Sequence, residues 1–148
     1  MRLKDISEFG LIERIARGVK TDASVIKGIG DDAAALSWTR DKYLLVTADM
    51  LIEDRHFRRG APAQKVGWKA LCCGISDIAA MGGEPKWALV SCGLPKELPV
   101  KYTDGIYAGI EKAAKKFGVN IVGGDTNASD KIILDVMVLG EVKKKNLV

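Results

Sequence analysis

The chain has 148 residues, of which 47% are apolar and 28% are charged, and its net charge is +4. This length suits one domain with an apolar core, so we expect a single domain over residues 1–148. No apolar run approaches the roughly 20 residues of a membrane-spanning helix, and the start lacks a secretory signal. The cationic residues do not form the basic face typical of nucleic-acid binding. We therefore expect a cytoplasmic protein with neither a membrane nor a nucleic-acid partner.

The first predicted element is a helix from Ser7 to about Val19. Ser7 is a good N-cap residue, and the apolar residues at positions 11, 12, 15, 16 and 19 fall on one helical face. Val25 and Ile26 then predict a short strand that leads into a glycine-rich loop.

Two strands, Ala33–Trp38 and Tyr43–Ala48, follow this loop as a predicted hairpin with a polar connection over residues 39–42. The hairpin places Asp31 and Asp32 at the entrance of its first strand and Asp49 at the exit of its second. Because the two strands are antiparallel, these carboxylates can meet at one edge of the sheet.

A helix is predicted over Ala63–Ala80, after Pro62 and before the glycines at 82 and 83. Asp77 falls on or beside its apolar face, where an unpaired carboxylate would be costly, so we expect a cationic partner there. The helix also carries Cys72 and Cys73. With Cys92 the cysteines are odd in number and lack Cys-x-x-Cys spacing, which argues against disulfides and zinc.

The second half of the chain predicts three strands and one helix. The strands cover Trp87–Leu94, Val119–Val122 with a glycine pair after it, and Lys131–Val142, and the helix covers Tyr102–Phe117. The order α-β-β-β-α-β-α-β-β predicts a mixed sheet covered by helices, in the α/β or α+β class.

Five aspartates lie beside glycine or other small residues at predicted element boundaries. They are Asp31, Asp32, Asp49, Asp77 and Asp125. Mg²⁺ prefers oxygen ligands and usually bridges carboxylates to substrate phosphates, and glycine lets the backbone approach a phosphate closely. The pattern therefore indicates phosphoryl chemistry, although Gly and Asp also form ordinary turns.

The only histidine, His56, is flanked by Arg55, Arg58 and Arg59. A lone histidine is often a packing or surface residue, but these cations favour an interpretation in which the segment binds a phosphate. Neither a Walker loop nor a dinucleotide-binding fingerprint occurs, and no catalytic triad or activated cysteine is visible. We expect no side-chain nucleophile, because a direct metal-assisted phosphoryl transfer needs none.

These motifs, in this order and spacing, resemble the N-terminal domain of the thiamine-monophosphate kinase family, within the aminoimidazole ribonucleotide synthetase superfamily. The resemblance runs from Glu8 to Val142 and covers only the N-terminal half of the family's usual length. The segments that carry it are Gly30-Asp31-Asp32-Ala33-Ala34, Thr47–Glu53, His56-Phe57, Gly67–Leu71, Ser76–Pro85 and Gly123-Gly124-Asp125-Thr126.

The resemblance implies ATP-dependent phosphorylation of thiamine monophosphate to thiamine diphosphate with several Mg²⁺ ions. It implies metal binding by Asp32, Thr47, Ala48 (through its carbonyl oxygen), Asp49, Asp77 and Asp125. It also implies that His56 contacts the substrate, that Gly124 with Asp125 meets the nucleotide phosphates, and that Asp31 supports Asp32. Within the superfamily such domains pair into a barrel-like homodimer, and this chain alone is expected to be inactive.

Two departures from the family pattern concern the metal and substrate segments. Ala48 stands where members often have threonine, and Asp54-Arg55 where they often have Gly-Val. Selenophosphate synthetase and aminoimidazole ribonucleotide synthetase fit the motifs less well. A metal-dependent phosphohydrolase and a non-catalytic dimerisation module remain as alternatives from other functional classes.

Overall fold

A computed structural model describes all residues 1–148, and it confirms the predicted order of helices and strands. None of the helices combines the length and apolarity needed to cross a membrane. The principal elements are α1 (Glu8–Gly18), β1 (Val25–Lys27), β2 (Ala34–Ser37), β3 (Lys42–Ile52), α2 (Ala63–Ala80), β4 (Glu84–Leu94), α3 (Val100–Phe117), β5 (Asn120–Ala128) and β6 (Ile133–Lys143), with short 3₁₀ turns at Leu3–Asp5 and Lys144–Asn146.

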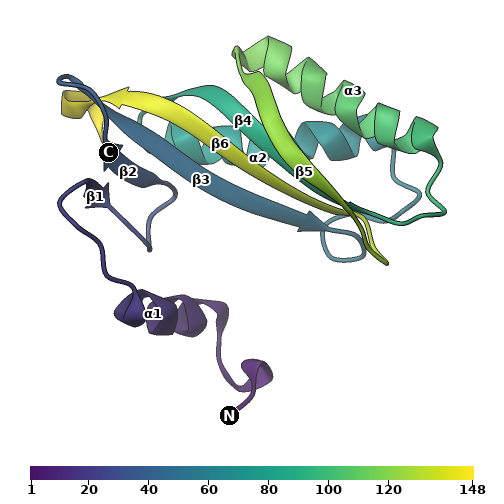
Figure 1. Ribbon diagram of the computed structural model, residues 1–148, viewed down its shortest axis with the longest axis horizontal. Coiled ribbons are helices and arrows are strands. Elements are labelled where there is room, and N and C mark those ends of the chain that lie inside the picture. Colours follow the sequence, from purple (N-terminus) through teal and green to yellow (C-terminus); the bar gives the residue numbers. More distant parts are fainter.

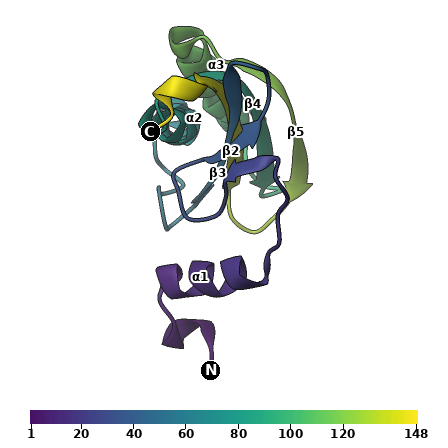
Figure 2. The ribbon, with the colours of Figure 1, turned by 90° about the vertical axis from the view of Figure 1, so that its left-hand side faces the viewer.

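The six strands form one sheet in the order β1-β2-β3-β6-β4-β5. All neighbours are antiparallel except β4 and β5, which are parallel, so the predicted mixed sheet is confirmed. Helices α2 and α3 lie side by side across one face of the sheet, whereas α1 stands apart beyond β1 (Figures 1 and 2). At α1 the predicted cap is present, since the Ser7 hydroxyl accepts a hydrogen bond from the Gly10 backbone N–H at 3.1 Å.

The two faces of the sheet differ in burial. On β6, Leu134, Val136 and Val138 are fully buried, and Val138 packs against α2 at Gly74. The alternate residue Met137 points to the other face and keeps 39% of its surface exposed. We call this uncovered side of the sheet the open face. Because side chains alternate along a strand, the face of every site residue follows from its position in the ladder.

Helices α2 and α3 approach each other closely through glycines. A Cβ atom at Gly67 would lie 1.8 Å from the carbonyl oxygen of Ile106. We therefore expect Gly67→Ala to force the helices apart and to lower the free energy of unfolding by about 2 kcal/mol, as measured by denaturant unfolding. Gly18→Ala is the control, because no neighbouring atom lies within 4 Å of its added Cβ; an equal loss in both variants would contradict the packing explanation.

Two predicted strand ends were wrong. Asp49 lies inside β3, which continues to Ile52 because β6 pairs with all eleven of its residues. The Gly123-Gly124-Asp125 segment lies inside β5 rather than in a turn, because β4 pairs with it as far as Ala128. Gly124 is needed there for close approach, since a Cβ at this position would lie 1.8 Å from the carbonyl oxygen of Val90.

Candidate active site

A threonine hydroxyl joins three separate segments at the centre of the candidate site. Thr47 on β3 is only 8% exposed. Its Oγ1 lies 3.0 Å from Oδ2 of Asp77 on α2 and 3.1 Å from the carbonyl oxygen of Asp32, in the loop before β2. The fold thus brings together three residues that are far apart in the sequence and that were predicted as metal ligands. Within the chain, the hydrogen-bond partner of Asp77 is this hydroxyl.

Asp49 extends this group by a second carboxylate. It lies two residues after Thr47 on the same strand, so both side chains face α2. Burial, a hydrogen bond with Asp77, and the negative charges of Asp77 and Asp135 together raise the pKa of Asp49 to about 6. Two carboxylates crowded in this way attract a cation, because a cation would relieve both the burial and the repulsion.

The glycine-rich loop before β2 forms one wall of a groove beside this group. The groove has a volume of about 770 Å³, and Thr47 and Ala48 line it together with residues 28–34 and two apolar residues of α1. Asp31 is engaged within the loop, where it accepts hydrogen bonds from the Asp32 backbone N–H at 2.9 Å and from Lys27 Nζ at 3.1 Å. These two hydrogen bonds, of which the one from Asp32 has the larger effect, hold the pKa of Asp31 below its usual range. Asp31 is therefore engaged by contacts within its own loop.

A second cleft, of about 580 Å³, opens between Asp49 and α2. From α2, the residues Trp68, Lys69, Cys72, Cys73, Ser76 and Asp77 line it. Burial raises the pKa of Cys73, which disfavours a reactive thiolate. Lys69 was missed from the sequence, although it lies eight residues before Asp77 and therefore shares its helical face. Its Nζ donates a hydrogen bond to the His56 carbonyl oxygen at 2.9 Å and so links the acidic group to the predicted substrate residue.

His56 lies exposed in the loop between β3 and α2. Its Nδ1 accepts a hydrogen bond from the Ile52 backbone N–H at 2.9 Å. In a neutral imidazole the other ring nitrogen, Nε2, then carries the proton and can donate it. Arg55 and Arg58 beside it are also exposed, so this segment offers several donors to an anion.

Asp125 is not brought to the same face as the other carboxylates. It pairs in register with Ser91 of β4, and Ser91 pairs with Asp135 of β6, which places this row on the open face. Thr47 and Asp49 lie on the face covered by α2 instead. Within this chain no group of three or more His, Cys, Asp or Glu side chains is arranged to hold a metal ion. The assembled group is therefore two carboxylates, a hydroxyl and the backbone carbonyl of Asp32.

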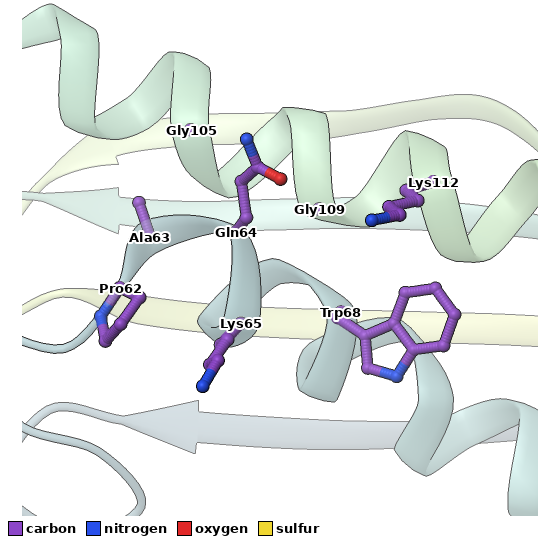
Figure 3. A pocket seen from close by; sticks show the side chains of 8 residues that line it. All are labelled: Pro62, Ala63, Gln64, Lys65, Trp68, Gly105, Gly109 and Lys112. Carbon is purple, nitrogen blue, oxygen red and sulfur yellow. The ribbon is translucent and has the colours of Figure 1, made fainter.

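A further groove lies between α2 and α3 (Figure 3) and shares Trp68 with the cleft beside Asp49. It has a volume of about 800 Å³ and is lined by Lys65 and Lys112 but by no acidic side chain. It therefore supplies no carboxylate ligand for Mg²⁺.

Comparisons with known proteins define the class to which this fold and site belong. Residues 30–142 match the family model "AIR synthase related protein, N-terminal domain", and the chain belongs to this family. The match begins at Gly30 and so includes Asp32, Thr47, Asp49 and Asp77.

Within this class, the chain is homologous to thiamine-monophosphate kinases. It is 41% identical to that of Aquifex aeolicus over 97% of this chain and 45% of the relative, and 38% identical to that of Bacillus subtilis over 94% and 43%. The solved complex of AaThiL with AMPPCP and TMP superposes with a TM-score of 0.90 at 41% identity, over 97% of this chain and 44% of that one. The chain thus spans about half the length of these relatives.

Proposed function

We propose that this chain is the metal- and nucleotide-binding half of a kinase that phosphorylates thiamine monophosphate to thiamine diphosphate, with ATP as the phosphoryl donor. The observation that carries the proposal is the meeting of Thr47, Asp49 and Asp77 beside the Asp32 carbonyl oxygen. The homology to thiamine-monophosphate kinases supports the choice of substrate, and the AaThiL complex with AMPPCP supports ATP.

The residues present fit Mg²⁺. This ion takes octahedral oxygen ligands and is usually bound by one or two carboxylates together with waters and substrate phosphates. Burial, and then the neighbouring Asp77, raise the pKa of Asp49, and a bound cation would favour the charged form of both carboxylates. Asp32, Thr47, Asp49, Asp77 and the carbonyl oxygen of Ala48 would hold the ions. When bound, Mg²⁺ would neutralise the charge on the phosphate oxygens and align them for in-line transfer.

The chain's own residues would then position the two substrates. His56, with Nε2 as a donor, would bind the phosphate of thiamine monophosphate. Gly124 and Asp125 would contact the nucleotide phosphates, with Asp125 as a further metal ligand. Because Asp125 lies on the open face, this contact would form near the boundary with a second copy of the chain.

A homodimer through the open face follows from the exposed apolar side chains there. Met50, Val122 and Met137 are 51%, 57% and 39% exposed, which is unfavourable for a face in water. We expect the chain to sediment as a dimer at micromolar concentration, and Met137→Lys to shift it to monomer, because a charge would be buried at the contact. The matched surface variant Val100→Lys, on α3, should stay dimeric. A monomeric parent chain would contradict the proposed pairing.

The function is tested by assaying the intact gene product with thiamine monophosphate, ATP and Mg²⁺. A kinase produces thiamine diphosphate and ADP in equal amounts. A phosphohydrolase would instead release phosphate from thiamine monophosphate without ATP, and a non-catalytic module would show no saturable binding of Mg²⁺ and an ATP analogue. Either of these results would overturn the proposal.

A further inference from the structure

An ion pair between a buried glutamate and a half-exposed arginine lies at the base of the loop that carries His56. We define the His56 loop as residues 53–59. Glu53 at its start is only 4% exposed. Its two carboxylate oxygens accept hydrogen bonds from Nε and Nη2 of Arg59, the latter at 2.9 Å, and Oε2 also accepts from the Ile132 backbone N–H at 3.0 Å. The pair thus closes the loop by joining its first residue to its last.

The same pair fastens the loop to the sheet. Arg59 Nη2 also donates a hydrogen bond to the carbonyl oxygen of Asp130 at 3.1 Å. The Glu53 backbone N–H donates to the carbonyl oxygen of Ile132 at 2.9 Å. Asp130 and Ile132 lie in the connection between β5 and β6, across the sheet edge from the loop. Both ends of the His56 loop are therefore tied to one place on the fold.

Inside the loop, backbone hydrogen bonds form tight turns: the Arg55 and His56 N–H groups donate to the Ile52 carbonyl oxygen at 3.1 and 2.9 Å, and the Asp54 N–H donates to that of Phe57 at 2.7 Å. The Glu53–Arg59 pair fixes where these turns sit against the sheet. Residues 54, 55, 56 and 58 are exposed, and Asp54 has a left-handed backbone with φ 67°, which is unfavourable for a residue other than glycine. An exposed segment in a strained conformation persists only where its surroundings impose it. The Glu53 carboxylate is buried, whereas the Arg59 side chain is half exposed, so we expect the pair to act mainly by defining the conformation of the loop.

We propose that Glu53 and Arg59 are positioning residues that hold His56 with Nδ1 on the Ile52 N–H and Nε2 protonated toward solvent, ready to donate to a phosphate oxygen. The hydrogen bond from Ile52 to Nδ1 is 2.9 Å long and forms only if the loop returns to the end of β3. Lys69 Nζ also donates to the His56 carbonyl oxygen at 2.9 Å. The ligand part of this inference rests on the proposed function, whereas the part about the imidazole does not.

The imidazole part is tested by nitrogen NMR of the chain under mildly alkaline conditions. The sequence contains a single histidine, so its ring signals need no assignment. The parent chain should show one tautomer, with the proton on Nε2. Glu53→Gln should give averaged tautomer signals and faster exchange of the Ile52 amide by at least about tenfold. Unchanged ring signals in folded Glu53→Gln would overturn the inference whatever the ligand.

Two further variants separate positioning from general stability. Glu141→Gln is the control. Glu141 also forms an ion pair, with Lys42, and accepts a hydrogen bond from Trp38, but it lies at the other end of β6. It should leave His56 unchanged even if it destabilises the fold. Arg59→Lys keeps the charge but not the two-point contact, and should give an intermediate ring signal. If Glu53→Gln does not fold, Arg59→Lys decides: ring signals identical to those of the parent would overturn the inference.

The ligand part is tested by a double-mutant cycle on thiamine monophosphate affinity, using Glu53→Gln and His56→Ala in the intact gene product. Each single variant should weaken binding about tenfold, and the double variant should be no weaker than His56→Ala, since Glu53 acts through His56. Fully additive losses would contradict positioning. If the parent protein does not bind thiamine monophosphate, the proposed function fails, and the imidazole signals still decide the role of Glu53.

Discussion

Replacement of Asp77 by asparagine is expected to lower the rate of thiamine diphosphate formation about 1000-fold, or roughly 4 kcal/mol of transition-state stabilisation. The asparagine would keep the size of the side chain and an oxygen that can accept from the Thr47 hydroxyl, which lies 3.0 Å from Asp77 Oδ2. The variant should therefore fold normally but lack the charge that helps to hold Mg²⁺. The measurement is steady-state production of thiamine diphosphate and ADP by the intact gene product.

The control for this prediction is Asp104→Asn. Asp104 is also a helical aspartate, but it lies exposed on α3 and makes no contact with the candidate site. Its replacement should leave the rate unchanged. Full activity in Asp77→Asn would show that this carboxylate is not part of the metal site.

Replacement of Asp49 by asparagine should stabilise the chain in the absence of Mg²⁺ and abolish the stabilisation that Mg²⁺ provides. The pKa of Asp49 is raised from 3.8 to about 6, chiefly by burial and then by Asp77. The folded chain therefore binds a proton more tightly than the unfolded one. This contribution to stability is fully present below about pH 4 and is lost as the pH rises through about 6.

At neutral pH the asparagine removes this repulsion, so the variant should unfold at a higher temperature. We expect a gain of about 1 kcal/mol, reduced from the full shift because solvent screens this partly exposed side chain, and hence a Tm higher by about 2–4 °C. Saturating Mg²⁺ with an ATP analogue should raise the Tm of the parent but not of Asp49→Asn. Thermal unfolding with and without the metal checks both effects, and a variant less stable than the parent without Mg²⁺ would contradict the account.

Local signals were sufficient to predict the helix that carries Asp77. Pro62 and the glycines at 82 and 83 delimit it, and its apolar period fixes which side is buried, so α2 was predicted with the bounds Ala63–Ala80 that the structure shows. The acidic motifs likewise indicated that Asp32, Asp49 and Asp77 belong together, and the family resemblance added Thr47 to them. Both predictions depend on residues that are close together in the sequence or on the ordinary chemistry of metal ligands.

The side of the sheet that Asp125 occupies could not be predicted in this way. β5 shifts its register against β4 between Ala88 and Leu89, so that Asp125 pairs with Ser91. Without this irregularity Asp125 would pair with Cys92 and face the helices, because a shift of one residue moves every following side chain to the other face. The bulge depends on contacts between distant segments, which no local pattern reveals.

Glu53 was missed as a separate feature for a similar reason. In the sequence it is one carboxylate at the end of a motif, six residues before one of several arginines. It is buried by the connection between β5 and β6. There it accepts a hydrogen bond at 3.0 Å from the backbone N–H of Ile132, which lies 79 positions away in the sequence. Such a contact becomes visible only once β3 and β6 are paired.

The central claim, that Thr47, Asp49 and Asp77 together hold metal-bound phosphates, is tested most directly by paramagnetic NMR. Mn²⁺ is added to the isotope-labelled chain with a non-hydrolysable ATP analogue, and excess Mg²⁺ then displaces it. We predict that the amide signals around Thr47, Asp49 and Asp77 broaden first, at stoichiometric Mn²⁺, and return with Mg²⁺. Broadening spread evenly over the exposed acidic residues, or confined to the surroundings of Asp125 on the open face, would contradict the account.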